Sequence, residues 1–208
     1  MKYFVKTPWL LRTLYASYTW KIDTNEKAVY LTFDDGPHPA ITPFVLDELK
    51  KHDALATFFC VGKNVCAHPE VYKQTLEAGH SVGNHTQNHL NGWKTANDVY
   101  LQDVASASHV IDSPLFRPPY GKLKIFQAKH LTAAMRRSAK VVMWDVLSAD
   151  FDREVSNEQC LQNVVLRSSP GSIIVFHDSE KAFERMRYAL PRVLQHFSDL
   201  GFRFLPVT

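Results

Sequence analysis

Residues 28–37 of this chain read AVYLTFDDGP, an apolar run that ends in two adjacent carboxylates and a Gly-Pro turn. The run from Ala28 to Phe33 is apolar on consecutive residues, which is typical of a strand buried on both faces of a parallel sheet. Two unpaired carboxylates cannot both enter a core, because burying an unpaired charge is costly. The stretch therefore predicts a strand that carries Asp34 and Asp35 to a metal or another cation, and a solvated Asp-Asp-Gly turn is the alternative.

Similar apolar runs recur along the chain, and helical patterns separate most of them. Alternating strands and helices indicate an α/β protein in which helices cover a parallel sheet. About seven such units would close a barrel slightly smaller than the eight-stranded one, although an open doubly wound sheet would also satisfy the alternation. The predicted strands are 28–33, 56–61, 80–83, 114–116, 141–146, 172–176 and 202–206.

Four helices are predicted from the residues at their ends. Thr42, followed by a proline, is the expected N-cap of the first helix, and Pro69 opens the second. Ser156 begins the third with a capping-box pattern, and Gly201 ends the last helix after an apolar stripe.

The length of 208 residues and the hydrophobic content of 45% fit one domain. We expect residues 1–27 to form an amphipathic lead-in packed on the domain of residues 28–208. Lys6, Pro8 and Arg12 interrupt the lead-in before a signal-peptide core or a membrane span develops. This absence favours a cytoplasmic location, whereas a chain whose leader had been removed would look the same and would be secreted or act at the cell envelope.

The formal net charge of +3 is spread along the chain without a long Lys/Arg block. Electrostatics therefore give little support for a nucleic-acid or anionic-membrane partner, and we expect no nucleic acid and no transmembrane segment. The three cysteines lack Cys-x-x-Cys spacing, which indicates neither a disulfide framework nor a thiolate zinc site. The oligomeric state cannot be read from the sequence.

Two histidines follow the third predicted strand, in the run HTQNH at 85–89. On a helical turn, His85 and His89 would project to one side within reach of one ion. Such a pair also arises by chance in a chain with ten histidines. Together with Asp35, however, it forms a three-ligand set with open positions, as a catalytic zinc needs to hold a water and lower its pKa.

Three further polar residues lie at predicted strand ends, where barrel enzymes carry their active sites. Arg117 begins the rigid turn RPPYG, and a guanidinium that faces the barrel mouth could pair with Asp34 and hold it ionised and oriented; a surface loop is the alternative. Asp150 and His177 lie just beyond the ends of two later predicted strands. A lone histidine is more often structural, but one with a carboxylate partner beside a metal site is a reasonable general acid.

These motifs together resemble those of the polysaccharide deacetylases with a NodB homology domain, carbohydrate esterase family 4. The resemblance covers roughly residue 28 to the C-terminus and implies a deformed (β/α)7 barrel, the NodB homology fold. It also implies a bound divalent metal and hydrolysis of N-acetyl or O-acetyl groups on a glycan. The five motifs, in the family's order, are TFDDGP at 32–37, HTxxH at 85–89, RPPYG at 117–121, the motif ending at Asp150 and the motif ending at His177.

The resemblance also implies a role for each motif residue. Asp34 would be the general base, oriented by Arg117. His177 would be the general acid, oriented by Asp150, and the backbone N–H of Tyr120 would join the metal in stabilising the oxyanion. The implied metal ligands are Asp35, His85 and His89.

The expected substrate is an acetylated glycan, with the N-acetylglucosamine units of peptidoglycan or chitin oligomers first and acetylxylan O-acetyl groups second. A non-catalytic glycan-binding module and a hydrolase of small non-sugar amides are further alternatives. Zn²⁺ is the expected ion, and Co²⁺, Ni²⁺ and Mn²⁺ suit the same ligands. The chain departs from the family at Phe151, usually Trp, which removes an indole N–H, and at Val175, usually Leu, which is expected to enlarge the acetyl pocket.

Overall fold

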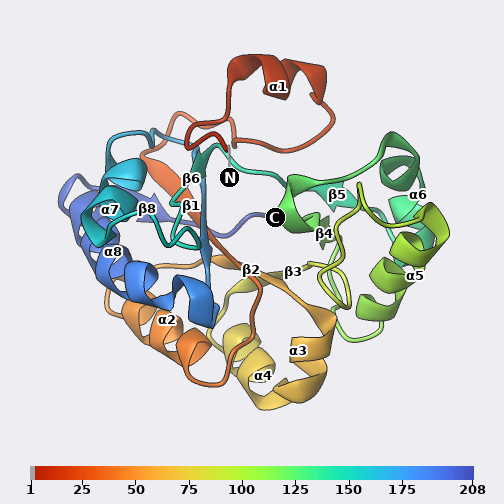
Figure 1. Ribbon diagram of the computed structural model, residues 1–208. Helices are drawn as coiled ribbons and strands as arrows, with labels where there is room; N and C mark the ends of the chain where they lie inside the picture. Colours follow the sequence, from red (N-terminus) through yellow and green to blue (C-terminus); the bar gives the residue numbers. More distant parts are fainter. Residues whose placement is uncertain (1–2) are drawn as a thin grey trace.

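The computed structural model describes residues 3–208, in which strands and helices alternate along most of the chain (Figure 1). The strands are β1 (Ala28–Asp34), β2 (Thr57–Cys60), β3 (Ser81–Asn84), β4 (Leu115–Phe116), β5 (Lys140–Val141), β6 (Val146–Leu147), β7 (Ile173–His177) and β8 (Arg203–Phe204). The helices are α1 (Trp9–Leu14), α2 (Ile41–Lys50), α3 (Gly62–Ala67), α4 (Pro69–Glu77), α5 (Asn97–Ala107), α6 (Ile125–Met135), α7 (Asn157–Val165) and α8 (Glu180–Asp199), with a 3-10 turn η1 at Pro119–Gly121. Within the described part of the chain, no helix is both long and apolar enough to span a bilayer.

The sheet is parallel and follows the order β5-β4-β3-β2-β1-β7-β6, with β8 paired to the start of β1. Its two end strands, β5 and β6, are separated by only four residues of chain, so residues 140–147 border β4 on one side and β7 on the other. The sheet curls into a deformed barrel whose end strands β5 and β6 are joined at this seam by the chain and not by pairing, and the predicted α/β fold class is confirmed. The single strand predicted at 141–146 is wrong, because the segment changes its pairing partner halfway and forms two short strands.

The N-terminal segment hydrogen-bonds to this seam. Thr19 lies parallel to Val142, and Lys6 lies antiparallel to Val146. The ammonium group of Lys6 also lies 2.6 Å from the carboxylate of Asp145, which is fully buried. Residues before β1 therefore contact the barrel at the seam, where the end strands β5 and β6 have no further strand beside them. The division of the chain at residue 28 stays a prediction.

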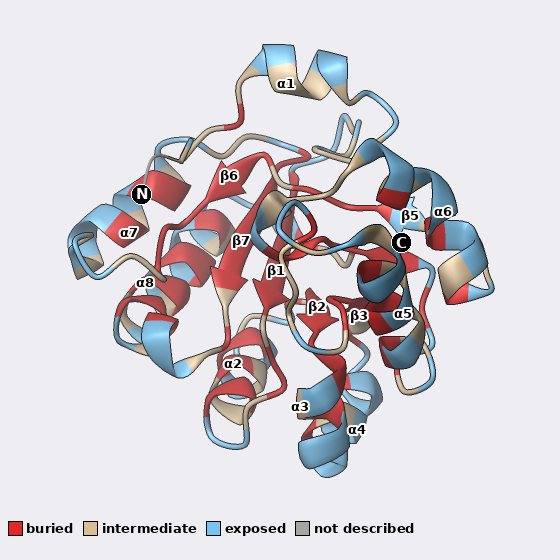
Figure 2. Ribbon diagram, turned by 45° about the vertical axis from the view of Figure 1, so that its right-hand side comes forward, coloured by how far each residue is buried: buried red, intermediate tan, exposed pale blue. Residues whose placement is uncertain are grey.

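The core lies between the sheet and the helices, as the buried strands and the outward-facing exposed helix surfaces in Figure 2 show. Val29, Leu31 and Phe33 of β1 pack with buried residues of α2 and α8. The alternate residues of β1 face the barrel interior, where Tyr30 packs in a second cluster and Thr32 is buried. Both faces of β1 are thus buried, which explains its continuous apolar run, and each such Leu or Phe side chain contributes about 1.5–3 kcal/mol by leaving water.

Two of the predicted helix starts are confirmed. Pro69 is the first residue of α4, and the hydroxyl of Ser156 caps α7 by accepting the N–H of Gln159 at 3.1 Å. Thr42 is not an N-cap, because α2 begins at Ile41 and the Thr42 hydroxyl instead bonds a buried carboxylate near the barrel mouth. The short helices α1 and α3 and the longer α5 and α6 were not individually predicted.

Candidate active site

All eight site residues predicted from the sequence lie at the carboxyl ends of the strands or in the loops that follow them. The structure brings them to one end of the barrel, because parallel strands present their carboxyl ends on the same side. Asp34 and His177 are even register partners on the neighbouring strands β1 and β7. By origin, Asp34 ends β1 and Asp35 follows it, His85 and His89 follow β3, Arg117 and Tyr120 follow β4, Asp150 follows β6, and His177 ends β7.

Asp35, His85 and His89 form a compact cluster whose ligand atoms all lie within 4.8 Å of one another. The Oδ1 atom of Asp35 is 3.8 Å from Nε2 of His85 and 3.1 Å from Nε2 of His89. One carboxylate and two imidazoles are a ligand set that zinc and similar divalent ions bind. The spacing of the three groups therefore suits a single metal ion.

The hydrogen bonds of the cluster test whether a cation fits there. Nδ1 of His85 is 2.7 Å from the backbone carbonyl of Arg117, which can only accept, so Nδ1 carries the proton and Nε2 presents its lone pair to Asp35. Burial lowers the pKa of His85 to about 4, so the ring is neutral at physiological pH. Oδ1 of Asp35 is buried and receives no well-aligned hydrogen bond. Two facing lone-pair atoms in a buried site fit a cation between them.

The loop that carries the two histidines is not helical, so the predicted helical turn is wrong. Thr86 and His89 both have positive φ, 65° and 57°, which re-aims the chain between the two rings. Asn84 holds the first turn by accepting the N–H of Thr86 at 2.8 Å. Asp103 of α5 accepts the backbone and side-chain N–H groups of Asn88 at 3.0 and 2.6 Å. Hydrogen bonds from other elements therefore set the spacing that the helix was expected to provide.

Asp34 and Arg117 form a buried ion pair, with Nη1 of Arg117 2.7 Å from Oδ1 of Asp34. The guanidinium is fully buried, and it also donates to the hydroxyl of Thr32 and to the backbone carbonyls of Val142 and Met143 in the seam. Because every arm of the guanidinium is bonded, Arg117 fixes the direction of the Asp34 carboxylate. Breaking such a buried pair from one side typically costs about 3–5 kcal/mol.

His177 and Asp150 form the second pair, with Nδ1 of His177 2.8 Å from Oδ1 of Asp150. The other Asp150 oxygen accepts the backbone N–H of His177 at 2.8 Å, and the Asp150 carbonyl accepts Nε of Arg185 at 2.6 Å. Burial alone would lower the pKa of His177, but the charge of Asp150 and its hydrogen bond outweigh burial and raise the pKa to about 9. His177 is therefore protonated at neutral pH.

Tyr120 lies in a left-handed turn after β4. Its φ of 59° is left-handed, and among residues 3–208 its backbone N–H has no hydrogen-bond acceptor. The ring lies edge-on to that of His89, with centroids 4.7 Å apart. A free backbone N–H is a group that can bind a developing negative charge on oxygen.

Comparison with known proteins identifies the family. Residues 21–140 match the sequence model of the polysaccharide deacetylase family. The chain is 33% identical over 196 residues to a peptidoglycan-N-acetylglucosamine deacetylase of Bacillus cereus, and the match covers 91% of each chain. It is also 33% identical to a chitooligosaccharide deacetylase of Azorhizobium caulinodans, over 76% of this chain and 77% of that protein.

This chain belongs to the polysaccharide deacetylase family. Its fold matches the crystal structure of a peptidoglycan N-acetylglucosamine deacetylase in complex with 4-naphthalen-1-yl-N-oxidanyl-benzamide with a TM-score of 0.85. That match has 31% sequence identity and covers 97% of this chain and 95% of the other. Membership confirms the resemblance that the five motifs carry and makes this polysaccharide deacetylase a hydrolase.

The sequence analysis did not single out Asp178, which shapes the turn after Asp35 in this polysaccharide deacetylase. Asp178 is buried, accepts the N–H of Gly36 at 2.9 Å and the hydroxyl of Thr42 at 2.5 Å, and has a pKa that burial raises to about 7. A Cβ on Gly36 would lie 2.0 Å from the Asp178 carboxylate, so only glycine fits the turn after Asp35. The position of Asp178 next to His177 in the sequence could have indicated its role. No local sequence pattern marks Asp103, which holds the loop that carries His89.

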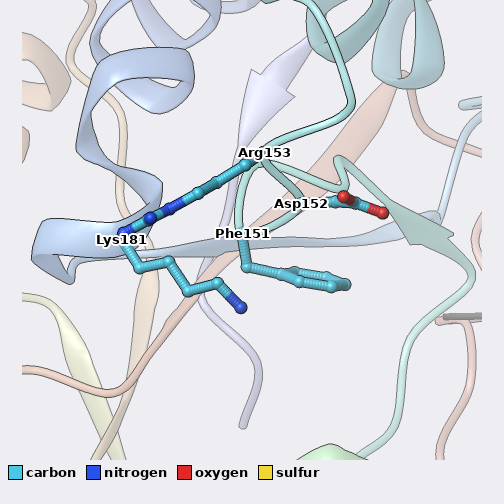
Figure 3. Close-up of a pocket in the computed structure, with 4 residues that line it drawn as sticks. All are labelled: Phe151, Asp152, Arg153 and Lys181. Atoms are coloured by element: carbon cyan, nitrogen blue, oxygen red, sulfur yellow. The ribbon is translucent and has the colours of Figure 1, made fainter.

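Phe151, which stands where the family usually has Trp, borders a cavity of about 230 Å³ (Figure 3). The cavity is lined by Phe151, Asp152, Arg153 and Lys181. The Phe151 ring packs edge-on against His177, with centroids 5.2 Å apart. The Lys181 ammonium reaches toward the same ring and lies 5.6 Å from its centroid. Val175 is buried in β7, and its expected effect on the acetyl pocket stays a prediction.

Proposed function

We propose that this polysaccharide deacetylase removes the acetyl group from N-acetylglucosamine units of a glycan of the peptidoglycan or chitin type. The observation that carries the proposal is the Asp35–His85–His89 cluster at the same barrel mouth as two buried acid–base pairs. The relatives named above act on peptidoglycan N-acetylglucosamine and on chitooligosaccharides, and both substrates contain this unit.

The proposed metal ligands are Asp35, His85 and His89, and Zn²⁺ is the proposed ion because it favours mixed imidazole and carboxylate sites with open positions. When bound, such an ion would polarise the acetyl carbonyl and lower the pKa of water. The lone-pair arrangement of His85 and Asp35 supports this assignment without reference to any relative.

The protein's own residues supply the proton transfers. Arg117 holds the Asp34 carboxylate in direction. Asp34 accepts a proton from the attacking water as the water oxygen bonds to the carbonyl carbon. The Tyr120 N–H donates to the carbonyl oxygen as negative charge develops on it. Nδ1 of His177 is bonded to Asp150, so Nε2 is left to protonate the amine nitrogen as the C–N bond breaks, releasing acetate and a glucosamine unit.

The test is acetate release from N-acetylglucosamine oligomers, peptidoglycan and acetylxylan, measured on metal-stripped protein with and without added Zn²⁺. Zinc-dependent release from the first two substrates is expected. Release from acetylxylan alone would replace the proposal with an O-acetyl esterase. Bound zinc without release from any substrate would support a glycan-binding module or a non-sugar amide substrate.

A further inference from the structure

Helix α1 projects from the body of the protein at the end of the barrel opposite the candidate active site. In Figure 2, β1 and β7 run away from α1 toward the mouth, and the chain after α1 pairs with the start of β7 through Lys21 and Ser172. No residue of α1 is buried. The exposed fractions of Trp9, Leu10 and Leu14 are 70, 61 and 70%.

The helix turns its apolar side outward and its charge inward, the reverse of an ordinary surface helix. With about 100° between residues, Trp9, Leu10 and Leu14 share one outward arc. Arg12 lies outside that arc, and its guanidinium is 3.5 Å from the buried carboxylate of Asp145. Thr7, just before the helix, is also fixed by donating its hydroxyl proton to the seam. Polar contacts therefore hold α1 in place while the fold leaves its apolar side unused.

The charge near this helix is mostly positive. Residues 1–22 include four Lys or Arg side chains and no Asp or Glu, and the exposed Asp23 follows beside Lys21. Lys6 and Arg12 share the single carboxylate of Asp145, so one positive charge is left over. Lys21 lies beside the end of α7, where it bonds Ser169, and within the described chain neither Lys21 nor the exposed Arg167 forms an ion pair. An anionic partner would thus meet an excess of cations next to the apolar side.

We propose that α1 docks this protein on an anionic lipid surface, with Trp9, Leu10 and Leu14 inserted at the headgroup boundary and Lys21 and Arg167 near lipid phosphates. Tryptophan and leucine suit this depth, and cations strengthen binding to anionic lipid. A protein partner fits less well, because six residues of helix span only about 9 Å, and a stable interface needs about 800 Å² on each partner.

Docking in this way sets the orientation of the enzyme. The barrel mouth lies at the end opposite α1, so it faces away from the lipid and stays open to a polymeric glycan. The overall charge of +3 does not reveal this feature, because the positive excess is local to the segment around α1. The proposal does not depend on the reaction proposed above.

Co-sedimentation of the full chain with phosphatidylcholine vesicles, with and without phosphatidylglycerol, tests the proposal. The wild type is expected to bind the anionic vesicles, and Leu10→Ser with Leu14→Ser should weaken binding at least about tenfold, since two buried leucines are lost. The matched control, Leu76→Ser with Leu200→Ser, removes two leucines exposed elsewhere and should bind like the wild type. Added salt should weaken binding by screening the cations.

Three results would overturn the proposal: no binding to anionic vesicles, equal binding to neutral vesicles, or equal binding by the Leu10/Leu14 variant. Light scattering without lipid adds a fourth, because a wild-type dimer that this variant converts to a monomer would show that a second copy covers α1. Acetate release from soluble N-acetylglucosamine oligomers should stay unchanged in all variants. That readout reports correct folding and separates failure of docking from failure of the proposed reaction.

Discussion

His177 shows how the surroundings of one residue set its chemistry. Because Asp150 raises the pKa of His177 to about 9, the ring keeps its proton at neutral pH and can act as an acid. We therefore expect the rate of acetate release to fall as the pH rises through about 9. Asp150→Asn should move this falling limb toward the ordinary value of 6.5, and the exposed Asp199→Asn should not. A limb that stays in place in pH–rate profiles would contradict the assignment of His177.

The same pair should make stability depend on pH. The folded-state pKa of His177 is raised, so its contribution is fully present below pH 6.5 and is lost as the pH rises through about 9. A shift of this size corresponds to about 3 kcal/mol. Urea unfolding of the wild type and Asp150→Asn at pH 6 and pH 10 should show a smaller loss of unfolding free energy in the variant. Equal losses in both proteins would show that the pair does not govern this dependence.

Asp34 is proposed to act as the base without binding the metal, so its substitution tests the reaction separately from metal binding. Asp34→Asn keeps the side-chain shape but removes the proton acceptor, so acetate release should fall by about 10²–10⁴-fold while bound zinc is retained. His85→Ala should lose both activity and zinc, because it removes a proposed ligand. Metal content and rate are measured on the same samples, with Asp199→Asn as the control. A near-normal rate in Asp34→Asn would refute the assignment of the base.

Among the elements, the loop between β3 and α5 depends most on a residue outside it. Asp103 of α5 holds the backbone on which His89 is carried, so it acts on the cluster without belonging to it. Asp103→Ala should weaken zinc binding by about tenfold, the lower end of the loss seen when a group that orients a ligand is removed, because Asp103 holds the backbone next to His89 and does not bond its ring. Its neighbour Gln102→Ala, on the same helix, is the control. Unchanged zinc affinity in Asp103→Ala, measured by competition with a chelator, would show that the loop holds its shape without this carboxylate.

For the whole molecule, the sequence was sufficient where its signals were local. The doubly buried run of β1 and the polar residues at strand ends predicted a parallel sheet, closed or open, with Asp34, His85, Arg117, Asp150 and His177 at strand ends. The family resemblance added the deformed barrel and the role of Tyr120. The two short strands of the seam could not be predicted, since their partners β4 and β7 are distant in the sequence. The left-handed residues Thr86 and His89 were also missed, because Asp103 of α5 holds the backbone between them from outside the loop.

The seam also predicts where the barrel is most sensitive to a change far from the mouth. The buried carboxylate of Asp145 joins three segments by accepting Lys6 at 2.6 Å and the hydroxyl of Ser172 at 2.6 Å and by lying near Arg12. Asp145→Ala should lower the free energy of unfolding by about 3 kcal/mol, because it leaves these donors without their acceptor. Urea denaturation measures this loss, with the exposed Asp98→Ala as the control. Acetate release by the folded fraction should be retained, and an unchanged unfolding midpoint would show that hydrogen bonding of the backbone alone closes the barrel.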